Sequence, residues 1–213
     1  VWWRSIGELR CGRRQLLQKH FAPEEPHHVW VRDMLAEVLS QRPGHLIPNQ
    51  PVNNGAETVL LINARYLAAE PVPKTGPEAV GVCDDQVAYL RLSSADASGL
   101  SPESLLAEKA LTVQEWADRL PSREEAPGVM IGHPWDLVHN NGEQLLADWK
   151  AAIARGGEPA VLGKVYDGAH LLTRENIHIG AGSVVKPCAV LDAEEGPIWI
   201  GENVTISPHC TIQ

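Results

Sequence analysis

Residues 177–213 read IHIGAGSVVKPCAVLDAEEGPIWIGENVTISPHCTIQ, and an aliphatic residue recurs every six positions through most of this stretch. The recurring residues form two runs of three: Ile179, Val185, Leu191 and then Ile200, Ile206, Ile212. A small residue follows most of them by four positions, at Ser183, Ala189, Val204 and Cys210. A period of six matches neither the 3.6-residue repeat of an amphipathic helix nor the two-residue alternation of an open-sheet strand. It predicts a parallel β-helix, in which each hexapeptide forms one short side of a coil around an aliphatic core.

The order of the patterns predicts two domains. Residues 1–160 mix strand and helix signals, whereas residues 161–213 carry the hexapeptides. The two hexapeptide runs are separated by nine residues, which is one period plus a three-residue insertion, and they make about two coils. The chain has no initiator methionine and stops one residue into a repeat, so we expect it to be a fragment of a longer protein.

Strand and helix signals divide the first domain. The expected elements are a strand at 29–31, a helix at 33–42, a strand at 59–64 buried on both faces, a strand at 87–92, a capped helix at 112–120 and a helix from Asp136 to Ala154 with a break near Gly142. The net charge of −9 argues against binding to nucleic acid or to an acidic membrane. No apolar run is long enough to cross a bilayer. Four scattered cysteines without a Cys-x-x-Cys pair are typical of reduced thiols, so we expect a cytoplasmic protein.

The first candidate site is a basic cluster near the start of the chain. Five basic residues, Arg4, Arg10, Arg13, Arg14 and Lys19, face one acid, Glu8, within the first twenty positions. The guanidinium group of arginine pairs well with phosphate oxygens, and nearby glycines allow the backbone to approach a phosphate. The cluster therefore predicts an anion site. A solvated basic turn that leads into a helix is the alternative.

Two further segments are rich in polar groups. Asn63 and Arg65 follow the apolar run 59–62, and open α/β sheets bind ligands outside the carboxyl ends of their strands. The alternative is that Asn63 ends the strand and bonds its own backbone. In the segment 132–143, Trp135 is a candidate for stacking on a base or a sugar.

The same segment offers hydrogen-bonding and metal-binding groups. Asn140 and Asn141 are candidates for hydrogen bonds to sugar hydroxyls, and Asp136 is a candidate ligand for Mg²⁺. The alternative is a helix N-terminus capped by Asp136 with a packed Trp135. We interpret His178 and His209, which lie in the hexapeptides, as surface turn residues.

Four segments together resemble a known family. RSIGELRCGR (4–13), LLINARYL (60–67), PWDLVHNNGE (134–143) and the hexapeptide stretch look like the sugar nucleotidyltransferase family. Its members are described as relatives of the bifunctional UDP-N-acetylglucosamine pyrophosphorylase/glucosamine-phosphate N-acetyltransferase. The resemblance implies an α/β nucleotidyltransferase-like domain followed by a left-handed parallel β-helix, usually in a homotrimer.

The resemblance also implies a reaction. A sugar phosphate oxygen would attack the α-phosphorus of a nucleoside triphosphate and expel pyrophosphate, with help from arginine and Mg²⁺. Arg4, Arg10 and Arg13 would hold the triphosphate, Asn63 would lie near the sugar nucleotide, and Asp136 or Asn141 near the sugar or the metal. A complete β-helix would add acetyl transfer from acetyl-CoA.

The chain departs from the family pattern in two places. The glycine-rich loop that ends in lysine is absent from it, and Asn63 stands where the family strand ends in a metal-binding aspartate. Two alternatives to the transferase therefore remain: a non-catalytic subunit that binds a nucleotide sugar and trimerises, and an acyltransferase with a degenerate front domain.

Overall fold

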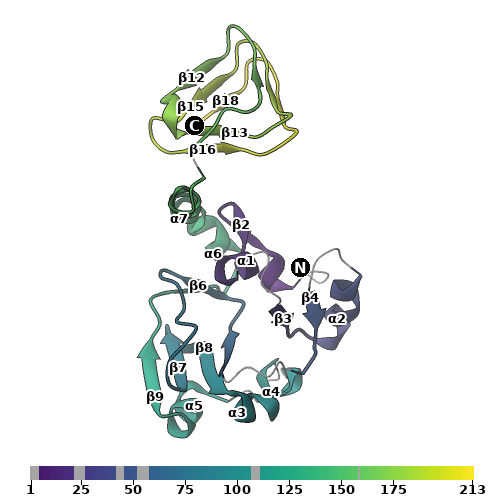
Figure 1. The fold of residues 1–213 in the computed structure, drawn as a ribbon, viewed down its shortest axis with the longest axis vertical. Helices are drawn as coiled ribbons and strands as arrows, with labels where there is room; N and C mark the ends of the chain where they lie inside the picture. The colour runs from purple at the N-terminus through teal and green to yellow at the C-terminus, as the bar shows by residue number, and fades with distance from the viewer. Residues whose placement is uncertain (1–4, 22–26, 42–45, 52–57, 107–110, 158) are drawn as a thin grey trace. The chain divides into compact units, whose positions relative to one another are not determined.

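The computed structural model describes residues 5–21, 27–41, 46–51, 58–106, 111–157 and 159–213 (Figure 1). The chain divides into two compact units, 1–140 and 141–213. This division falls twenty residues before the predicted domain boundary, because the helix that follows Asn140 groups with the second unit. Among the described residues, no helix has both the length and the apolar character needed to span a membrane.

The first unit is built on a four-stranded sheet with the order β5-β8-β7-β9. The strands are β5 (Thr58–Ile62), β7 (Ala79–Cys83), β8 (Gln86–Ser93) and β9 (Ser122–Glu125). Strand β8 runs antiparallel to both β5 and β7, and only β9 runs parallel to β7. The centre of the sheet is β7, whose five residues are all buried.

This arrangement corrects the expectation for residues 59–64. Strand β5 lies at the edge of the sheet, and Val59 is its one buried residue. The run is more apolar than β7, but pairing with β8 on one side only leaves it half-exposed. The strand that is buried on both faces is β7, which the hydrophobic pattern did not single out.

Each face of the sheet has its own apolar cluster. On one face, Val80, Leu90 and Leu92 pack against Ala97 of α3 (Ser94–Ser98) and Trp116 of α5 (Val113–Arg119). The other face is covered by Tyr66, Tyr89, Ala126 and Met130, which form a second cluster with Cys83 and Ala88. Tyr66 and Met130 belong to the antiparallel pair β6 (Tyr66–Ala68) and β10 (Gly128–Met130).

Shorter elements complete the first unit. They are η1 (Ile6–Glu8), β1 (Arg10–Cys11), β2 (Arg14–Gln15), α1 (Leu16–His20), β3 (His27–Val29), α2 (Asp33–Ser40), β4 (Leu46–Pro48), α4 (Pro102–Leu106) and α6 (Pro134–His139). The predicted helix after Asp33 and the capped helix after Thr112 are confirmed, and the Thr112 side chain accepts from the amide of Glu115. The predicted break in the helix from Asp136 to Ala154 is also confirmed, at Asn140.

The second unit begins with α7 (Asn141–Ala154) and continues in short parallel strands. The strands are β11 (Lys164–Val165), β12 (His170–Leu172), β13 (Ile177–Ile179), β14 (Val184–Val185), β15 (Val190–Asp192), β16 (Ile198–Ile200), β17 (Thr205–Ile206) and β18 (Thr211–Ile212), with η2 (Arg174–Asn176) between β12 and β13. They form three parallel sheets with the orders β11-β14-β17, β12-β15-β18 and β13-β16 (Figure 1).

The register of these sheets explains the sequence spacing. Val165 pairs with Val185 twenty residues later, and Val185 pairs with Ile206 twenty-one residues later. Equivalent strands are three hexapeptides apart, and the predicted three-residue insertion between Val185 and Ile206 raises this spacing to twenty-one residues. The first value shows that the repeat already begins at Val165, one round earlier than the hexapeptide pattern indicated.

The recurring aliphatic residues form one core, as predicted. Ile179, Val185 and Leu191 are fully buried in it, and the small residue Ala189 is buried beside them. Turn residues with positive φ also recur at equivalent places, at Gly168, Cys188 and His209. His209 is therefore an exposed turn residue, as expected.

The expectation for His178 was wrong. It lies within β13, half-buried, and its ring stacks on Trp199 with 4.1 Å between the ring centroids. Its Nδ1 accepts a hydrogen bond from the Ala160 amide at 3.3 Å. The side chain faces outward from the strand, but Trp199 on the neighbouring strand covers it.

Candidate functional site

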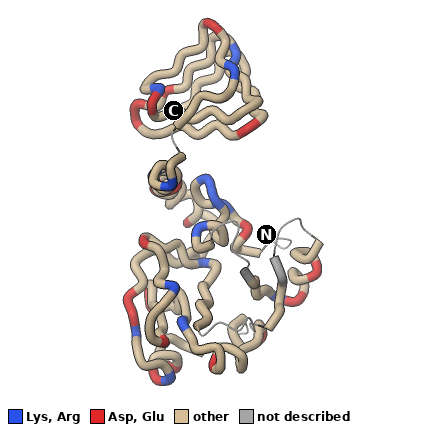
Figure 2. Tube along the Cα trace, in the orientation of Figure 1, with Lys and Arg blue, Asp and Glu red and all other residues tan. Residues whose placement is uncertain are grey.

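The basic cluster forms a tight hairpin. Strands β1 and β2 pair antiparallel, and Gly12 at φ +73° makes the turn between them. The Arg10 guanidinium donates to the Arg13 carbonyl at 2.7 Å, and both side chains are exposed to solvent. Figure 2 shows basic residues along this hairpin. Arg4, the third predicted phosphate ligand, lies outside the described residues.

Glu8 has a structural role in this segment. Its carboxylate accepts a hydrogen bond from the Ser5 amide at 2.8 Å, and the residue is 9% exposed. Because the carboxylate is turned onto its own backbone, it leaves the outward surface of the hairpin to the basic side chains.

A small apolar cluster joins the hairpin to two other segments of the first unit. Cys11 and Leu16 are buried with Leu67 and Ile131, and Leu137 of α6 packs against them. The Cys11 thiol also donates to the Leu137 carbonyl at 3.4 Å. The described parts of three segments of the first unit, 5–13, 60–67 and 134–140, therefore meet at one place, although they are far apart in the sequence.

The turn after β5 uses its polar side chains internally. Asn63 donates through Nδ2 to the Val87 carbonyl at 3.0 Å, and its Oδ1 accepts from the Arg65 amide at 3.0 Å. The Arg65 guanidinium donates to the Gln86 side chain. This geometry matches the alternative in which Asn63 closes a turn. The antiparallel sheet also removes the argument that placed Asn63 at the carboxyl ends of parallel strands.

His20 holds Tyr66, the residue that follows Arg65. Its Nε2 donates to the Tyr66 carbonyl at 2.9 Å, and its ring stacks on the Tyr66 ring. Burial lowers the pKa of His20 below the ordinary value of 6.5, and the charges of Arg14 and Lys19 lower it further. The imidazole is therefore neutral at pH 7, so it does not add a positive charge beside Arg14 and Lys19.

Asp136 caps the start of α6. Its Oδ2 accepts from the amides of Gly132 and His133 at 2.9 and 2.8 Å, and these hydrogen bonds lower the pKa of its carboxyl group. The Asn140 side chain donates to the Asp136 carbonyl at 2.8 Å and so caps the other end. Asn141 is exposed and begins α7.

Trp135 departs from the alternative in which its side chain is packed. It is 57% exposed and stacks on the exposed His133 ring with 4.5 Å between centroids. The cap explains Asp136, but it does not bury this indole. Trp135 therefore presents an aromatic face to solvent on the same short helix that contacts the hairpin.

A pocket beside Tyr66 was not expected from the sequence. It has a volume of about 280 Å³ and lies between Tyr66, Tyr89 and the segments 70–73 and 124–127. Tyr89 donates to the Glu124 carboxylate, which also pairs with the buried Arg91. The only available signal was strand alternation, which places residues 89 and 91 on one face of β8.

Comparison with known proteins assigns the family. The model of the family described as sugar nucleotidyl transferase matches residues 1–155, and the chain belongs to that family. A search of the curated proteins finds no match. The family match contains all three segments that meet at Cys11 and ends before the parallel strands of the second unit begin.

Proposed function

We propose that the first unit binds a nucleoside triphosphate and a sugar phosphate and transfers the nucleotidyl group, which forms a nucleotide sugar and pyrophosphate. One observation carries this proposal: the buried contact between Cys11 and Leu137 brings the basic hairpin and α6 together within the family match. Phosphate oxygens need cations, which the hairpin supplies, and a base or sugar ring needs an aromatic face, which α6 supplies.

In this proposal the hairpin holds the triphosphate. Arg10 and Arg13 lie three positions apart across the Gly12 turn, and both are exposed to solvent. Two guanidinium groups near one triphosphate would favour the charge that accumulates on the departing pyrophosphate. Trp135 would stack on the base or the sugar, and the amides of Asn140 and Asn141 would bond sugar hydroxyls. Asn63 and Arg65 would shape the turn beside them.

Mg²⁺ is part of the proposal because the reaction moves a highly charged phosphate group. Asp136 is charged at neutral pH, and its two amide hydrogen bonds engage only Oδ2. One carboxylate oxygen suits Mg²⁺, which takes one or two protein carboxylates and fills its other positions with water and phosphate oxygens. When bound, the ion would neutralise phosphate charge. The described residues contain no group of three or more His, Cys, Asp or Glu that could hold a metal alone.

We extend the proposal to the second unit. Three parallel sheets around one aliphatic core support a left-handed parallel β-helix. Through it the chain would form a homotrimer, and with further coils it would transfer an acetyl group from acetyl-CoA. Sedimentation equilibrium tests the assembly: a homotrimer has three times the chain mass of 23.2 kDa, and a monomer at micromolar concentration would contradict it.

A pyrophosphate-release assay tests the transferase. The chain is incubated with Mg²⁺, UTP or dTTP, and N-acetylglucosamine phosphate or glucose phosphate. We expect release that requires one nucleotide and one sugar phosphate together. Arg10→Ala should lower kcat/KM by about 10- to 100-fold, because a charge-assisted hydrogen bond is worth roughly 1.5–3 kcal/mol. Arg123→Ala is the matched control, since it removes an exposed arginine from β9.

One observation favours a second candidate, a non-catalytic subunit that binds a nucleotide sugar. The Asn63 amide is fully engaged in the turn, and it stands where the family has a metal-binding aspartate. In that case UDP-sugars would bind with micromolar affinity, Arg10→Ala would weaken the binding, and no combination of substrates would release pyrophosphate. Equal affinities for the wild type and Arg10→Ala would contradict both candidates.

A further inference from the structure

A cationic cluster lies on the outer surface of the second unit, outside the family match. Strands β11 and β14 pair so that Val165 is opposite Val185, and Tyr166 and Lys186 are the residues that directly follow the two strands. Val185 is fully buried, so its neighbour Lys186 points outward by strand alternation. Lys164 and Tyr166 flank Val165 in the same way.

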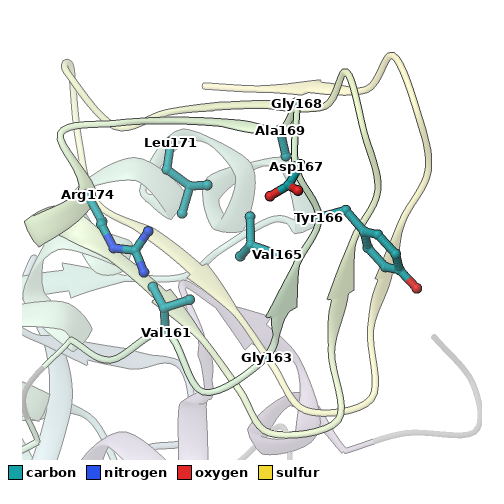
Figure 3. Close-up of a pocket in the computed structure, with 9 residues that line it drawn as sticks. All are labelled: Val161, Gly163, Val165, Tyr166, Asp167, Gly168, Ala169, Leu171 and Arg174. Atoms are coloured by element: carbon teal, nitrogen blue, oxygen red, sulfur yellow. The ribbon is translucent and has the colours of Figure 1, made fainter.

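The three side chains lie close together. The Lys164 ammonium is 4.3 Å from the centre of the Tyr166 ring, and the Lys186 ammonium is 4.9 Å from it. The two positive charges are therefore within about 9 Å of each other. Figure 3 shows Val165 and Leu171 pointing into a pocket inside the first coil, whereas the Tyr166 ring points away from it.

No carboxylate balances these charges within the described residues. The ion pairs found there include neither lysine, and both lysine charges act on the Tyr166 hydroxyl. Figure 3 also shows the Asp167 carboxylate on the pocket side, turned away from the Tyr166 hydroxyl. The two lysines carry like charges that repel each other, although the chain as a whole has a net charge of −9. A bound anion would reduce this repulsion.

We infer that Lys164, Tyr166 and Lys186 form a binding site for a phosphate group on a small ligand, separate from the nucleotidyl-transfer site. The two ammonium groups supply the charge, and the Tyr166 hydroxyl supplies a neutral donor. Lysine is a common phosphate ligand, and the ammonium groups approach from two neighbouring strands that fix their spacing. The hydrogen bond with Lys164 and the two positive charges lower the pKa of the Tyr166 hydroxyl, which makes it a stronger hydrogen-bond donor.

The chain offers a site-specific probe, because it has only three tyrosines. Tyr66 and Tyr89 are buried, and burial raises the pKa of each to about 12, so Tyr166 titrates first. In the full chain labelled with ¹³C on the tyrosine rings, Tyr166→Phe assigns the signal. Inorganic phosphate is then added at constant ionic strength against chloride, and the Tyr166 signal is followed.

We expect the Tyr166 signal to shift and saturate with phosphate, and its pKa to rise as the bound anion offsets the lysine charges. Lys186→Gln should weaken phosphate binding about tenfold or more, as expected for a charge-assisted hydrogen bond. Lys150→Gln, which removes an exposed lysine from α7, should change it less than about twofold. A shift that chloride reproduces, or equal effects of the two substitutions, would overturn the inference. Because the readout is at Tyr166, phosphate bound at the Arg10 hairpin does not imitate it.

Discussion

Gly81→Ala tests the packing at the centre of the first unit. Gly81 lies opposite Tyr89 in the β7–β8 pair. A Cβ at Gly81 would lie 2.1 Å from Cε1 of the Tyr89 ring and 2.4 Å from Cδ1 and Cζ. No side chain tolerates such contacts, so the added methyl group must displace the ring. The pairing of β7 with β8 shifts register between Gly81 and Val82, but Gly81 is not among the residues with positive φ, and therefore the ring is what excludes alanine.

The cost follows from what Tyr89 loses. It is 3% exposed, packs with Tyr66 and Met130, and donates to the Glu124 carboxylate. Deletion of a buried aromatic side chain costs about 3–5 kcal/mol, and a displaced ring keeps part of its contacts. A lost hydrogen bond adds about 1 kcal/mol. We expect Gly81→Ala to lower the free energy of unfolding of the first unit by about 3 kcal/mol.

Hydrogen exchange of the β7 and β8 amides, read by mass spectrometry across a urea series, reports this unit separately. The matched control is Gly81→Ala in a Tyr89→Ala background. There the methyl group meets no ring, and alanine gains about 0.5–1 kcal/mol over glycine in a strand. The coupling energy between the two substitutions should then reach about 3.5–4 kcal/mol. Additive effects of the two substitutions would refute the reasoning.

Three further predictions concern stability. Ser183→Ala should cost about 2 kcal/mol in urea unfolding, because its buried hydroxyl bonds an amide and a carbonyl of the next coil; a loss under 0.5 kcal/mol would contradict this. Folded Tyr66 and Tyr89 have pKa values of about 12 against 10 unfolded, so stability should fall between pH 10 and 12 by about 3 kcal/mol for each. Tyr89→Phe should remove the part of this loss that Tyr89 contributes. An unchanged dependence of stability on pH in this range would contradict the prediction. The pKa of His20 is lower in the folded state, so this group contributes stability that is present above pH 6.5 and lost at lower pH. His20→Gln should therefore make the free energy of unfolding depend less on pH in the acid range. An unchanged dependence would show that another group is responsible.

The repeat was predictable because its cause is local. Each hexapeptide places one aliphatic side chain inward, so the spacing of Ile179, Val185 and Leu191 indicates a shared core directly. The three-residue insertion between the runs accounts for the twenty-one-residue register that the strand pairs show. The earlier round was missed because η2 (Arg174–Asn176) changes the spacing to twenty. Handedness and assembly remain predictions.

The sheet of the first unit was less predictable because strand position depends on tertiary pairing. The run at 58–62 is the more hydrophobic, yet it forms the edge, whereas Ala79–Cys83 forms the centre. Arg91 shows the same limit. It is 2% exposed on the central strand β8, where its charge is met by Glu124 and by carbonyls of the 73–77 loop. None of these partners is near Arg91 in sequence.

The candidate site shows why polar motifs are ambiguous in sequence. Asn63 and Asp136 were chosen because amides and carboxylates bind ligands, but the same groups satisfy backbone amides at turns and helix ends. In the structure both side chains serve the backbone. Arg10 and Trp135 differ, because each stays exposed while its segment is anchored by Cys11 or Leu137 beneath it. A rigid base with an exposed charged or aromatic tip is what a ligand requires, so these two side chains are the sharper tests of the proposed transferase.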